Sequence, residues 1–480
     1  MISDSIRKPG SYSKIVKGAG GGLPSRRMEM LIIAPRLGSS SVAAGAPTRV
    51  FSADQAAHSF GAGSIMHRMA MAAFRQFAQV SLTCCAVDDT AAGVAASASI
   101  SFTGSAAATG TFTLWVGTDR ITIRVDKGDT VADVVEALTN EINNNHPNLP
   151  VTASHTSGTV VLTAKNKGTI GNSLGQKGHP AISVDVDGVS ATTTTYSGGA
   201  GDADLSTALA KVAGERYHLI VIPYTNIDAA QTLSEHVTMV SDEINQLGAR
   251  GFMFLDGNFA ATYTFARSIN DKRMNVGYIY GAKRHSFENA AAMAAMLAAQ
   301  DAPWRAVNDE PLIGCDAPEI PDRFMWNEID TLLWNGITPF EVGTGERVRC
   351  VRAISTYIKS DSGAEDDTFL DTHKIATADY VRDAVRTRHS NDFKNKILRD
   401  NHVPGEPPGI ITAEDVRLTN LDVCRRIERE GGLNDVEAFE EQFTSVRNPN
   451  APGRVDSVIP IDIVDAAHIM ANTIMITSTL

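Results

Sequence analysis

The sequence has few cysteines and no cysteine motif. Their number is odd and no C-x-x-C pair occurs, so a zinc site, a redox motif and a disulfide framework have no support. The five residues are Cys84, Cys85, Cys315, Cys350 and Cys424. The adjacent Cys84 and Cys85 lie in an apolar segment, and we interpret them as small buried residues. A reducing compartment fits this pattern best.

Long apolar runs, a secretion signal and an excess of positive charge are also missing. No run of about 18 apolar residues occurs, as a membrane-spanning helix would need. The first residues lack the apolar core of a signal peptide. The formal net charge of −12 argues against a general nucleic-acid-binding protein, which would show a basic face. We therefore expect neither a nucleic-acid partner nor a direct membrane span.

Enzyme motifs are missing as well. There is no G-x-x-x-x-G-K-[ST], no G-x-S-x-G and no H-E-x-x-H. Gly61-Ala62-Gly63 and Gly343-Thr344-Gly345 lack the third glycine of a dinucleotide-binding motif, and we interpret them as turns. The acidic segment Asp361–Asp367 lacks the spacing of a calcium loop. The sequence thus predicts no cofactor-binding residue and no metal site.

One aspartate and three histidines remain as candidates for chemistry. Asp256 follows an apolar strand, where α/β proteins place their active sites, but a turn and a helix cap explain it more simply. The histidines His218, His285 and His468 are isolated, and we interpret them as core or surface residues. No nucleophile has a recognisable partner, so we expect no catalytic residue.

The chain of 480 residues is too long for one core, and its composition divides it into six segments. These are an N-terminal arm at 1–24, the first part of a core at 25–87, an inserted domain rich in Thr, Ser and Gly at 88–200, an α/β region at 201–310, a C-terminal domain at 311–454 and a C-terminal strand arm at 455–480.

The first core segment and the inserted domain have different patterns. In the core, Met28–Ala34 is a buried strand, Arg49–Phe51 is a short strand, Ser52 caps a helix, and Ser64–Phe77 is an amphipathic helix. The inserted domain has mostly strand patterns and one amphipathic helix. Its hairpin covers Phe112–Val125, its helix Thr130–Asn144, and its further strands Thr159–Ala164 and Ala181–Val184.

After the insertion, solid apolar strands alternate with helices, which predicts a parallel sheet covered by helices. The strands are Tyr217–Ile222, Gly251–Leu255 and Val276–Tyr280, and the helices are Ala229–Leu247, Phe259–Ile269 and Phe287–Ala299. In the first of these helices, we expect one face to point inward with Leu233, Val237, Val240, Ile244 and Leu247.

The last third contains further helices and a strand. We predict a helix at Phe324–Trp334, a strand at Val348–Ile358 and two charged helices at Ala376–Arg399 and Thr412–Glu430. Gly431-Gly432 ends the second charged helix.

The C-terminal arm carries two consecutive strand patterns. In the first, Ile459, Ile461 and Ile463 alternate with other residues, and in the second, Ile469–Ile476 is almost entirely apolar or small. Termini fray unless a sheet holds them, and bare strand edges template association. We therefore expect these residues, including Ile474 and Ile476, to pair with a strand of the same chain or of the next one.

The N-terminal arm also has a short strand pattern, followed by a glycine cluster. The strand residues are Tyr12, Lys14, Ile15 and Val16, and the glycines are Gly18, Gly20, Gly21 and Gly22. A cluster of this kind is typical of a flexible hinge.

Several short motifs resemble the contractile-tail sheath proteins, and the tail resembles their Mu-like branch. Lys8–Tyr12 resembles the "PGVY" arm of this family. The segment that begins MLIIAPRLG at Met30 and runs to Phe60-Gly61 resembles the early core. The tail VIPIDIVDAAHIMANTIMI resembles the closing strands of the branch.

The resemblance implies an α/β and α+β multidomain protein with a subtilisin-like α/β sheath domain and an inserted, sandwich-like β domain that faces outward. The subtilisin-like domain is not known to be a protease in this family. In agreement, the chain has neither a His-Gly-Thr nor a Gly-Thr-Ser-Met-Ala motif. The subunits would form stacked six-fold rings around a tail tube and contract. The two arms would add strands to neighbouring subunits, and the charged helices would face the tube.

The implied partners are copies of the same chain, the tail tube protein, and the baseplate and tail terminator proteins. The implied location is the contractile sheath of a virion tail, with synthesis in the bacterial host cytoplasm. Three alternatives stay open: the sheath of a non-phage contractile injection device, an α/β enzyme, and an adhesive surface protein with a Thr-rich β domain.

Overall fold

A computed structural model describes residues 23–475 of the chain. The predicted arm residues Tyr12, Lys14, Ile15 and Val16, the hinge glycines Gly18, Gly20, Gly21 and Gly22, and Ile476 lie outside the described residues. The described chain forms two compact units. Unit 1 comprises residues 23–25 and 380–464, and unit 2 comprises residues 26–379 and 465–475.

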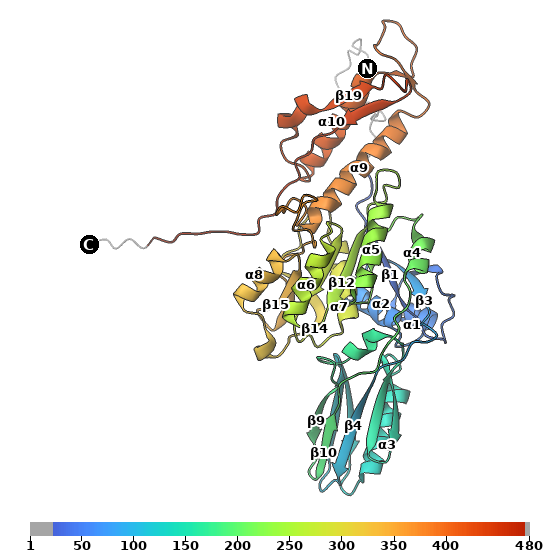
Figure 1. Cartoon of the computed structure of the whole chain (residues 1–480), viewed down its shortest axis with the longest axis vertical. Coiled ribbons are helices and arrows are strands. Elements are labelled where there is room, and N and C mark those ends of the chain that lie inside the picture. The colour runs from blue at the N-terminus through green and yellow to red at the C-terminus, as the bar shows by residue number, and fades with distance from the viewer. Residues whose placement is uncertain (1–22, 476–480) are drawn as a thin grey trace, which may run out of the picture. The chain divides into compact units, whose positions relative to one another are not determined.

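Unit 2 is built on a nine-stranded sheet with the strand order β14-β16-β15-β13-β12-β11-β1-β3-β2 (Figure 1). The strands from β3 across to β15 run parallel, and β2, β16 and β14 add antiparallel strands at the two edges. The strands are β1 (Glu29–Pro35), β2 (Pro47–Val50), β3 (Ser81–Val87), β11 (Leu219–Val221), β12 (Arg250–Leu255), β13 (Met274–Tyr278), β14 (Glu310–Asp316), β15 (Thr338–Gly343) and β16 (Arg347–Cys350). The predicted parallel sheet is confirmed, and the strand predicted at Val348–Ile358 ends early, at Cys350.

Helices cover both faces of this sheet, because successive strand residues point to opposite sides. In β1, Met30 and Ile32 belong to one apolar cluster, whereas Leu31 and Ile33 belong to another. The first cluster includes helices α1 (Ala53–Phe60), α2 (Ile65–Gln76) and α7 (Ser286–Ala298). The second includes α4 (Ser206–Val212), α5 (Ile227–Val240), α6 (Phe259–Ile269) and α8 (Trp326–Trp334). The sheet thus lies between two helical layers.

Side-chain caps set several helix boundaries, and one of them corrects a prediction. Ser52 caps α1 as predicted. The helix predicted to reach Leu247 ends at Val240, and Ile244, predicted to point inward, is 84% exposed. Asp242 Oδ1 accepts hydrogen bonds from the backbone N–H groups of Ile244 and Asn245 at 2.9 and 2.6 Å. This local turn competes with continuation of the helix.

The inserted segment forms a four-stranded sheet, β10-β4-β8-β7, and a three-stranded sheet, β6-β5-β9. The strands are β4 (Ser97–Gly104), β5 (Gly110–Val116), β6 (Asp119–Val125), β7 (Val151–Thr156), β8 (Thr159–Ala164), β9 (Ala181–Asp185) and β10 (Val189–Thr193), and the helix is α3 (Val131–Asn140). The predicted hairpin is the β5–β6 pair. Strands β4, β7 and β10 have no counterpart among the predicted elements.

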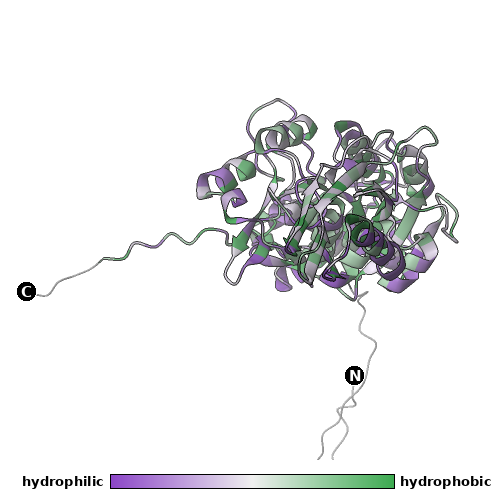
Figure 2. Ribbon diagram, turned by 90° about the horizontal axis from the view of Figure 1, so that it is seen from below, coloured by the Kyte–Doolittle hydropathy of each residue, from purple (hydrophilic) through white to green (hydrophobic). Residues whose placement is uncertain are grey.

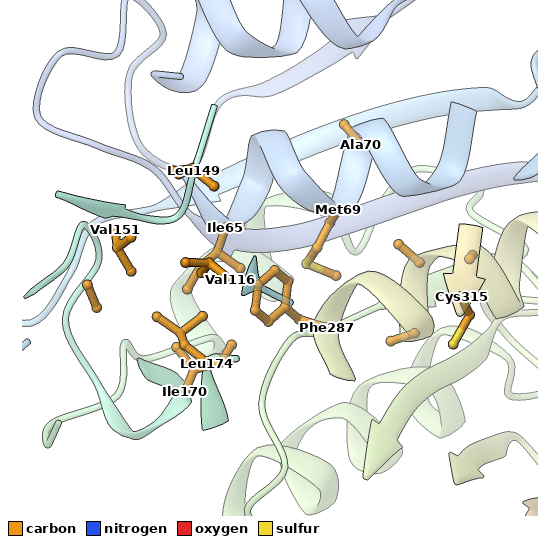
Figure 3. Close-up of a cluster of buried hydrophobic side chains, with 14 of the residues drawn as sticks. Ile65, Met69, Ala70, Val116, Leu149, Val151, Ile170, Leu174, Phe287 and Cys315 are labelled. Carbon is orange, nitrogen blue, oxygen red and sulfur yellow. The ribbon is translucent and has the colours of Figure 1, made fainter. Parts of the chain in front are cut away.

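The inserted segment shares its apolar core with the helices of unit 2. Val116 of β5 and Leu174 belong to the same cluster of buried side chains as Ile65 and Met69 of α2 and Phe287 of α7. Figure 3 shows these side chains gathered between the strands of the insertion and the two helices. A continuous core of this kind makes the insertion a rigid extension of the α/β layers.

A buried ion-pair network crosses the same boundary. Arg68 of α2, which is 1% exposed, lies with Nε 2.7 Å from Glu288 Oε1 of α7 and with Nη2 2.6 Å from Asp119 Oδ2 of β6. His285 Nδ1 lies 3.0 Å from Glu288 Oε1. Because Arg68 and Glu288 are both removed from water, each depends on the other, whereas the Asp119 side chain stays 33% exposed.

Unit 1 contains most of the two charged helices that the sequence predicts. The predicted charged helices are present as α9 (Thr372–Asp392), within which the two units meet, and α10 (Ala413–Arg429). The first therefore ends seven residues before the predicted Arg399. Two short ladders accompany them: β17 (Ile397–Leu398) with β18 (Ile410–Ile411), and β19 (Thr444–Arg447) with β20 (Val455–Val458). Buried side chains of α10, such as Leu421, Cys424 and Ile427, form its core.

Candidate assembly site

The first predicted strand of the C-terminal arm forms only at its beginning. β20 pairs antiparallel with β19 from Val455 to Val458, and Ser445 Oγ and Ser457 Oγ lie 2.7 Å apart across the ladder. The predicted strand residues Ile459, Ile461 and Ile463 lie beyond its end. Ile463 makes a single antiparallel bridge, to Leu433. In the described part of the chain, the ladder with β19 therefore serves four residues, and of the three isoleucines Ile463 alone is paired, by one bridge.

The β19–β20 ladder has one face open to solvent. Val446 and Val458 are each 62% exposed, and the cross-strand register puts them on the same face. The opposite face carries Ser445 and Ser457, and β19 packs beside α10. In the part of the chain that the structure describes, the ladder has two strands and no third. Two-stranded sheets are marginal alone, and each outer edge presents unpaired backbone groups.

The last described residues expose large apolar side chains without forming a helix or a strand. Ile469 is 85% exposed, Met470 74%, Ile474 88% and Met475 83%. Figure 2 shows this tail as an extended trace that carries hydrophobic residues away from the folded body. The second predicted strand is therefore absent from residues 469–475. Four exposed apolar side chains in seven residues are typical of a surface that is covered in an assembly.

The strand ends near Asp256 form a cavity but not a catalytic cluster. Asp256 lines a cavity of about 340 Å³ with Lys177, Tyr280 and Ser286, and its Oδ2 accepts a hydrogen bond from Ser286 Oγ at 3.0 Å. Desolvation by the surrounding protein raises the pKa of Asp256. Asn258 caps α6, so the cap predicted for Asp256 belongs to its neighbour two residues on.

The three histidines interpreted as isolated all have partners. His285 is engaged by Glu288 within the buried ion-pair network. His218 Nδ1 accepts a hydrogen bond from Glu29 N at 3.0 Å, and His468 Nε2 lies 3.2 Å from Asp371 Oδ1. The three histidines lie in the core or at the surface, as predicted. They are not isolated, because each contacts a partner.

Carboxylates near the point where open α/β sheets bind ligands are engaged in attaching the insertion. Strand order reverses between β1 and β11, and ligands of α/β proteins bind at such a point. Here Asp89 accepts a hydrogen bond from Lys167 N at 2.9 Å. Asp202 accepts from Thr169 N and Thr169 Oγ1 at 2.6 Å and from Asn226 Nδ2 at 2.9 Å. These carboxylates hold both stems of the insertion, a structural task.

Within residues 23–475, no group of three or more His, Cys, Asp or Glu side chains is placed to hold a metal ion. None of the helices described is long and apolar enough to span a bilayer.

Two family models match successive parts of the chain. The phage tail sheath protein central domain matches residues 198–356, and the phage tail sheath C-terminal domain matches residues 364–477. Together they cover more than half of the chain. The chain belongs to the phage tail sheath family. Residues 1–197, which include most of the inserted segment, lie outside both matches.

A relative of known name places this sheath protein in the Mu-like branch. The chain is 28% identical over 482 residues to the Mu-like prophage FluMu tail sheath protein of Haemophilus influenzae, with 98% of each chain covered. Two solved structures share its fold. A sheath tail protein of Listeria innocua covers 92% of this chain and 93% of its own, with 12% identity and a TM-score of 0.50. A chain of the anti-feeding prophage baseplate covers 98% and 100%, with 11% identity and a TM-score of 0.50.

The sheath protein is thus a structural subunit of a contractile tail and a component of the virion tail. Membership of this family indicates a non-enzymatic role, and the engaged carboxylates at the strand ends agree with it.

Proposed function

We propose that this sheath protein polymerises as stacked hexameric rings around a tail tube and contracts to drive the tube through the host envelope. The α/β layers of unit 2 would be the subtilisin-like sheath domain, and the inserted segment would face outward. The charged helices α9 and α10 are the candidates to face the tube protein. The terminator and baseplate proteins would cover the two ends of the stack. Synthesis would take place in the bacterial host cytoplasm.

The observation that carries this proposal is that one chain has both an unpaired apolar tail and a two-stranded ladder with open edges. The tail exposes Ile469 and Ile474 without a ladder, and the β19–β20 ladder exposes Val446 and Val458 without a third strand. An extended tail of one subunit can add to the sheet edge of the next and supply main-chain hydrogen bonds. Because donor and acceptor lie on different surfaces, the contact is head-to-tail and propagates into rings or helices.

The predicted interprotomer residues fit this scheme as donors. Ile474 is exposed on the tail, and Ile459, Ile461 and Ile463 continue from β20 toward it. Tyr12, Lys14, Ile15 and Val16, with Ile476, would pair in the same way, and the glycines of the N-terminal arm would act as the hinge during contraction.

The test is assembly of purified chains, followed by negative-stain electron microscopy and sedimentation velocity. The variant Ile469→Ser/Ile474→Ser removes apolar donors from the tail, and Asn472→Ser/Thr473→Ser changes polar neighbours as a matched control. We expect hollow tubes or six-fold rings from the wild type and the control, and subunits or short oligomers from the first variant. Normal tubes from the first variant, and from a chain that lacks residues 1–20, would overturn the proposal.

The alternative of a stand-alone injection device predicts the same polymer. We favour a virion, because the relative that spans the chain is a Mu-like prophage sheath protein. Native particles with capsids attached to the sheath would agree with a virion, and sheaths without capsids would point to the device.

A further inference from the structure

The tail does not leave unit 2 freely, because an ion pair at Asp465 and a side-chain contact at His468 hold its first residues. Asp465 Oδ1 lies 3.0 Å from Lys374 Nζ. Three residues later, His468 Nε2 lies 3.2 Å from Asp371 Oδ1, with side chains that are 15% and 9% exposed. The next residue, Ile469, is 85% exposed. Asp465 and Ala467 are exposed as well, so the side-chain contact of His468, and not a step in exposure, marks the last held residue.

Asp371 is itself fixed by an arginine. Arg352 contacts it with two hydrogen bonds, from Nε to Oδ1 and from Nη2 to Oδ2, both 2.8 Å. Burial alone would raise the pKa of Asp371, but His468 and Arg352 together hold it well below its usual range. The backbone of Asp371 also bridges to Ile354. Bidentate pairing and a backbone bridge give this carboxylate one position, so the group that receives the tail is preorganised.

We propose that Asp371, with Arg352 and Lys374, forms an anchor that fixes the point from which the C-terminal arm departs. Of the residues that follow Asp465, only those from Ile469 onward would then be given to a neighbouring subunit, and Ile459, Ile461 and Ile463, which precede the anchor, would pair separately. This inference rests on the proposed donation of the tail, and it adds the residues that position the donor.

The physical advantage of an anchor is that the donor strand samples a smaller volume before it meets its partner. A donor strand that starts at a fixed point samples a smaller volume than one that swings from the end of β20. Its effective concentration at the neighbour's sheet rises accordingly. An anchored start also leaves fewer residues to be ordered when the strand pairs. The anchor residues need not touch the neighbour, so they are positioning residues.

Charge reversal across the outer pair tests the anchor. Lys374→Asp and Asp465→Lys each replace attraction by repulsion, whereas the double variant restores an ion pair with reversed sign. We expect each single variant to need about threefold to tenfold more protein for half-maximal polymerisation, and the double variant to return toward the wild type. Asp301→Lys, which breaks an exposed pair with Arg305 elsewhere in unit 2, is the matched control and should assemble normally.

Mixing the two single variants decides whether the contact lies within one chain. If the anchor acts in cis, as the structure shows, an equal mixture of Lys374→Asp and Asp465→Lys chains stays impaired. Recovery in the mixture would mean that the pair forms between chains, and it would overturn the proposal.

Variants at the inner pair give an independent measurement. His468→Ala removes one of the two side chains that contact Asp371 Oδ1, and His468→Arg places a guanidinium there. Because Arg352 still pairs with Asp371 in both variants, we expect thermal unfolding of the subunit to change little. We expect the first variant to weaken polymerisation about tenfold and the second to recover most of it. Wild-type polymerisation by His468→Ala and by both charge reversals would refute the anchor.

A chain that ends at His468 separates this inference from the proposed function. If the truncated chain fails to polymerise while all anchor variants assemble normally, the anchor alone is refuted. If the truncated chain also assembles normally, donation of the tail is refuted with it.

Discussion

Replacing Arg68 with methionine should destabilise unit 2 by about 3–5 kcal/mol at neutral pH. Arg68 and Glu288 are 1% and 2% exposed, and the replacement leaves the Glu288 carboxylate buried with only His285 Nδ1 within 3.0 Å. Methionine keeps a long side chain at the position, so the loss reflects the missing charge more than a cavity. Removing one partner of a buried pair leaves an uncompensated charge in a low-dielectric interior.

The pH dependence gives a second estimate of the same interaction. Desolvation would raise the pKa of Glu288, but Arg68 and His285 outweigh it and lower the pKa from 4.5 to about 2. At about 1.36 kcal/mol per pH unit, this corresponds to about 3 kcal/mol. Because the folded-state pKa is depressed, the stabilisation is present above pH 4.5 and is lost as the pH falls toward 2. In Arg68→Met the carboxyl protonates more readily, so the difference between the two proteins should shrink through this window.

Urea unfolding followed by circular dichroism at several pH values measures both effects. The double variant Arg68→Met/Glu288→Met removes both charges and should recover most of the lost stability, since apolar replacements of buried pairs are often neutral. Hydrogen exchange should also accelerate in the hairpin that carries Asp119. A loss below about 1 kcal/mol at pH 7, or a loss that stays the same at pH 3, would refute the reasoning.

Three further predictions concern single sites. Gly63→Ala should strongly reduce the yield of soluble, folded protein and its thermal stability. Gly63 has φ +81°, and an added Cβ would lie 2.1 Å from the Leu149 carbonyl oxygen. Thr412→Ala should cost about 1 kcal/mol and speed hydrogen exchange in the first turn of α10, because Thr412 and Asp415 form a capping box; unchanged exchange would contradict this. All five thiols should resist Ellman's reagent until urea unfolds the chain, because all are buried and burial raises the pKa of thiols such as Cys84; rapid native labelling would contradict this.

The α/β layers were predictable because their strands are buried on both faces. A strand such as Phe252 to Leu255 is apolar at every position, and the sheet covers it with helices on both sides. Strands built from Ser, Thr and Ala lacked this signal. β10 consists mostly of Ser, Thr and Ala, and pairing with β4 gives it its structure. β4 alternates serine with the buried Ala98, Ile100 and Phe102, which is the period of a half-buried strand, so this strand could have been predicted and was missed.

The contacts that join the insertion to the core could not be predicted from the sequence. Arg68, Asp119 and Glu288 lie far apart along the chain, and none has a local pattern that marks it as buried. The same holds for Asp89 and Asp202 at the stems. Their partners are set by the way the sheets and helices pack, so only the folded chain reveals them. The end of α5 failed for a local reason, since a side-chain turn at Asp242 outweighed the apolar period.

The strand patterns of the tail were predicted, but a strand also needs a ladder. Alternation identified Ile459, Ile461 and Ile463 as strand residues, and the single chain offers them one bridge. An apolar pattern that stays unpaired in one folded chain indicates pairing with another, which is the basis of the proposed donation.

The energetics of the tail suggest when it engages. Ile469, Met470, Ile474 and Met475 are between 74% and 88% exposed, and burying each contributes about 2 kcal/mol. Fixing the seven residues from Ile469 to Met475 costs about 1–2 kcal/mol each, which roughly offsets that gain before the ladder hydrogen bonds contribute about 1 kcal/mol apiece. A free tail that met a free subunit would therefore bind weakly. In the proposed assembly, where other contacts hold the subunit and the anchor fixes the departure point, the same tail would engage at high effective concentration. This favours addition of subunits to an existing ring over pairing of free chains.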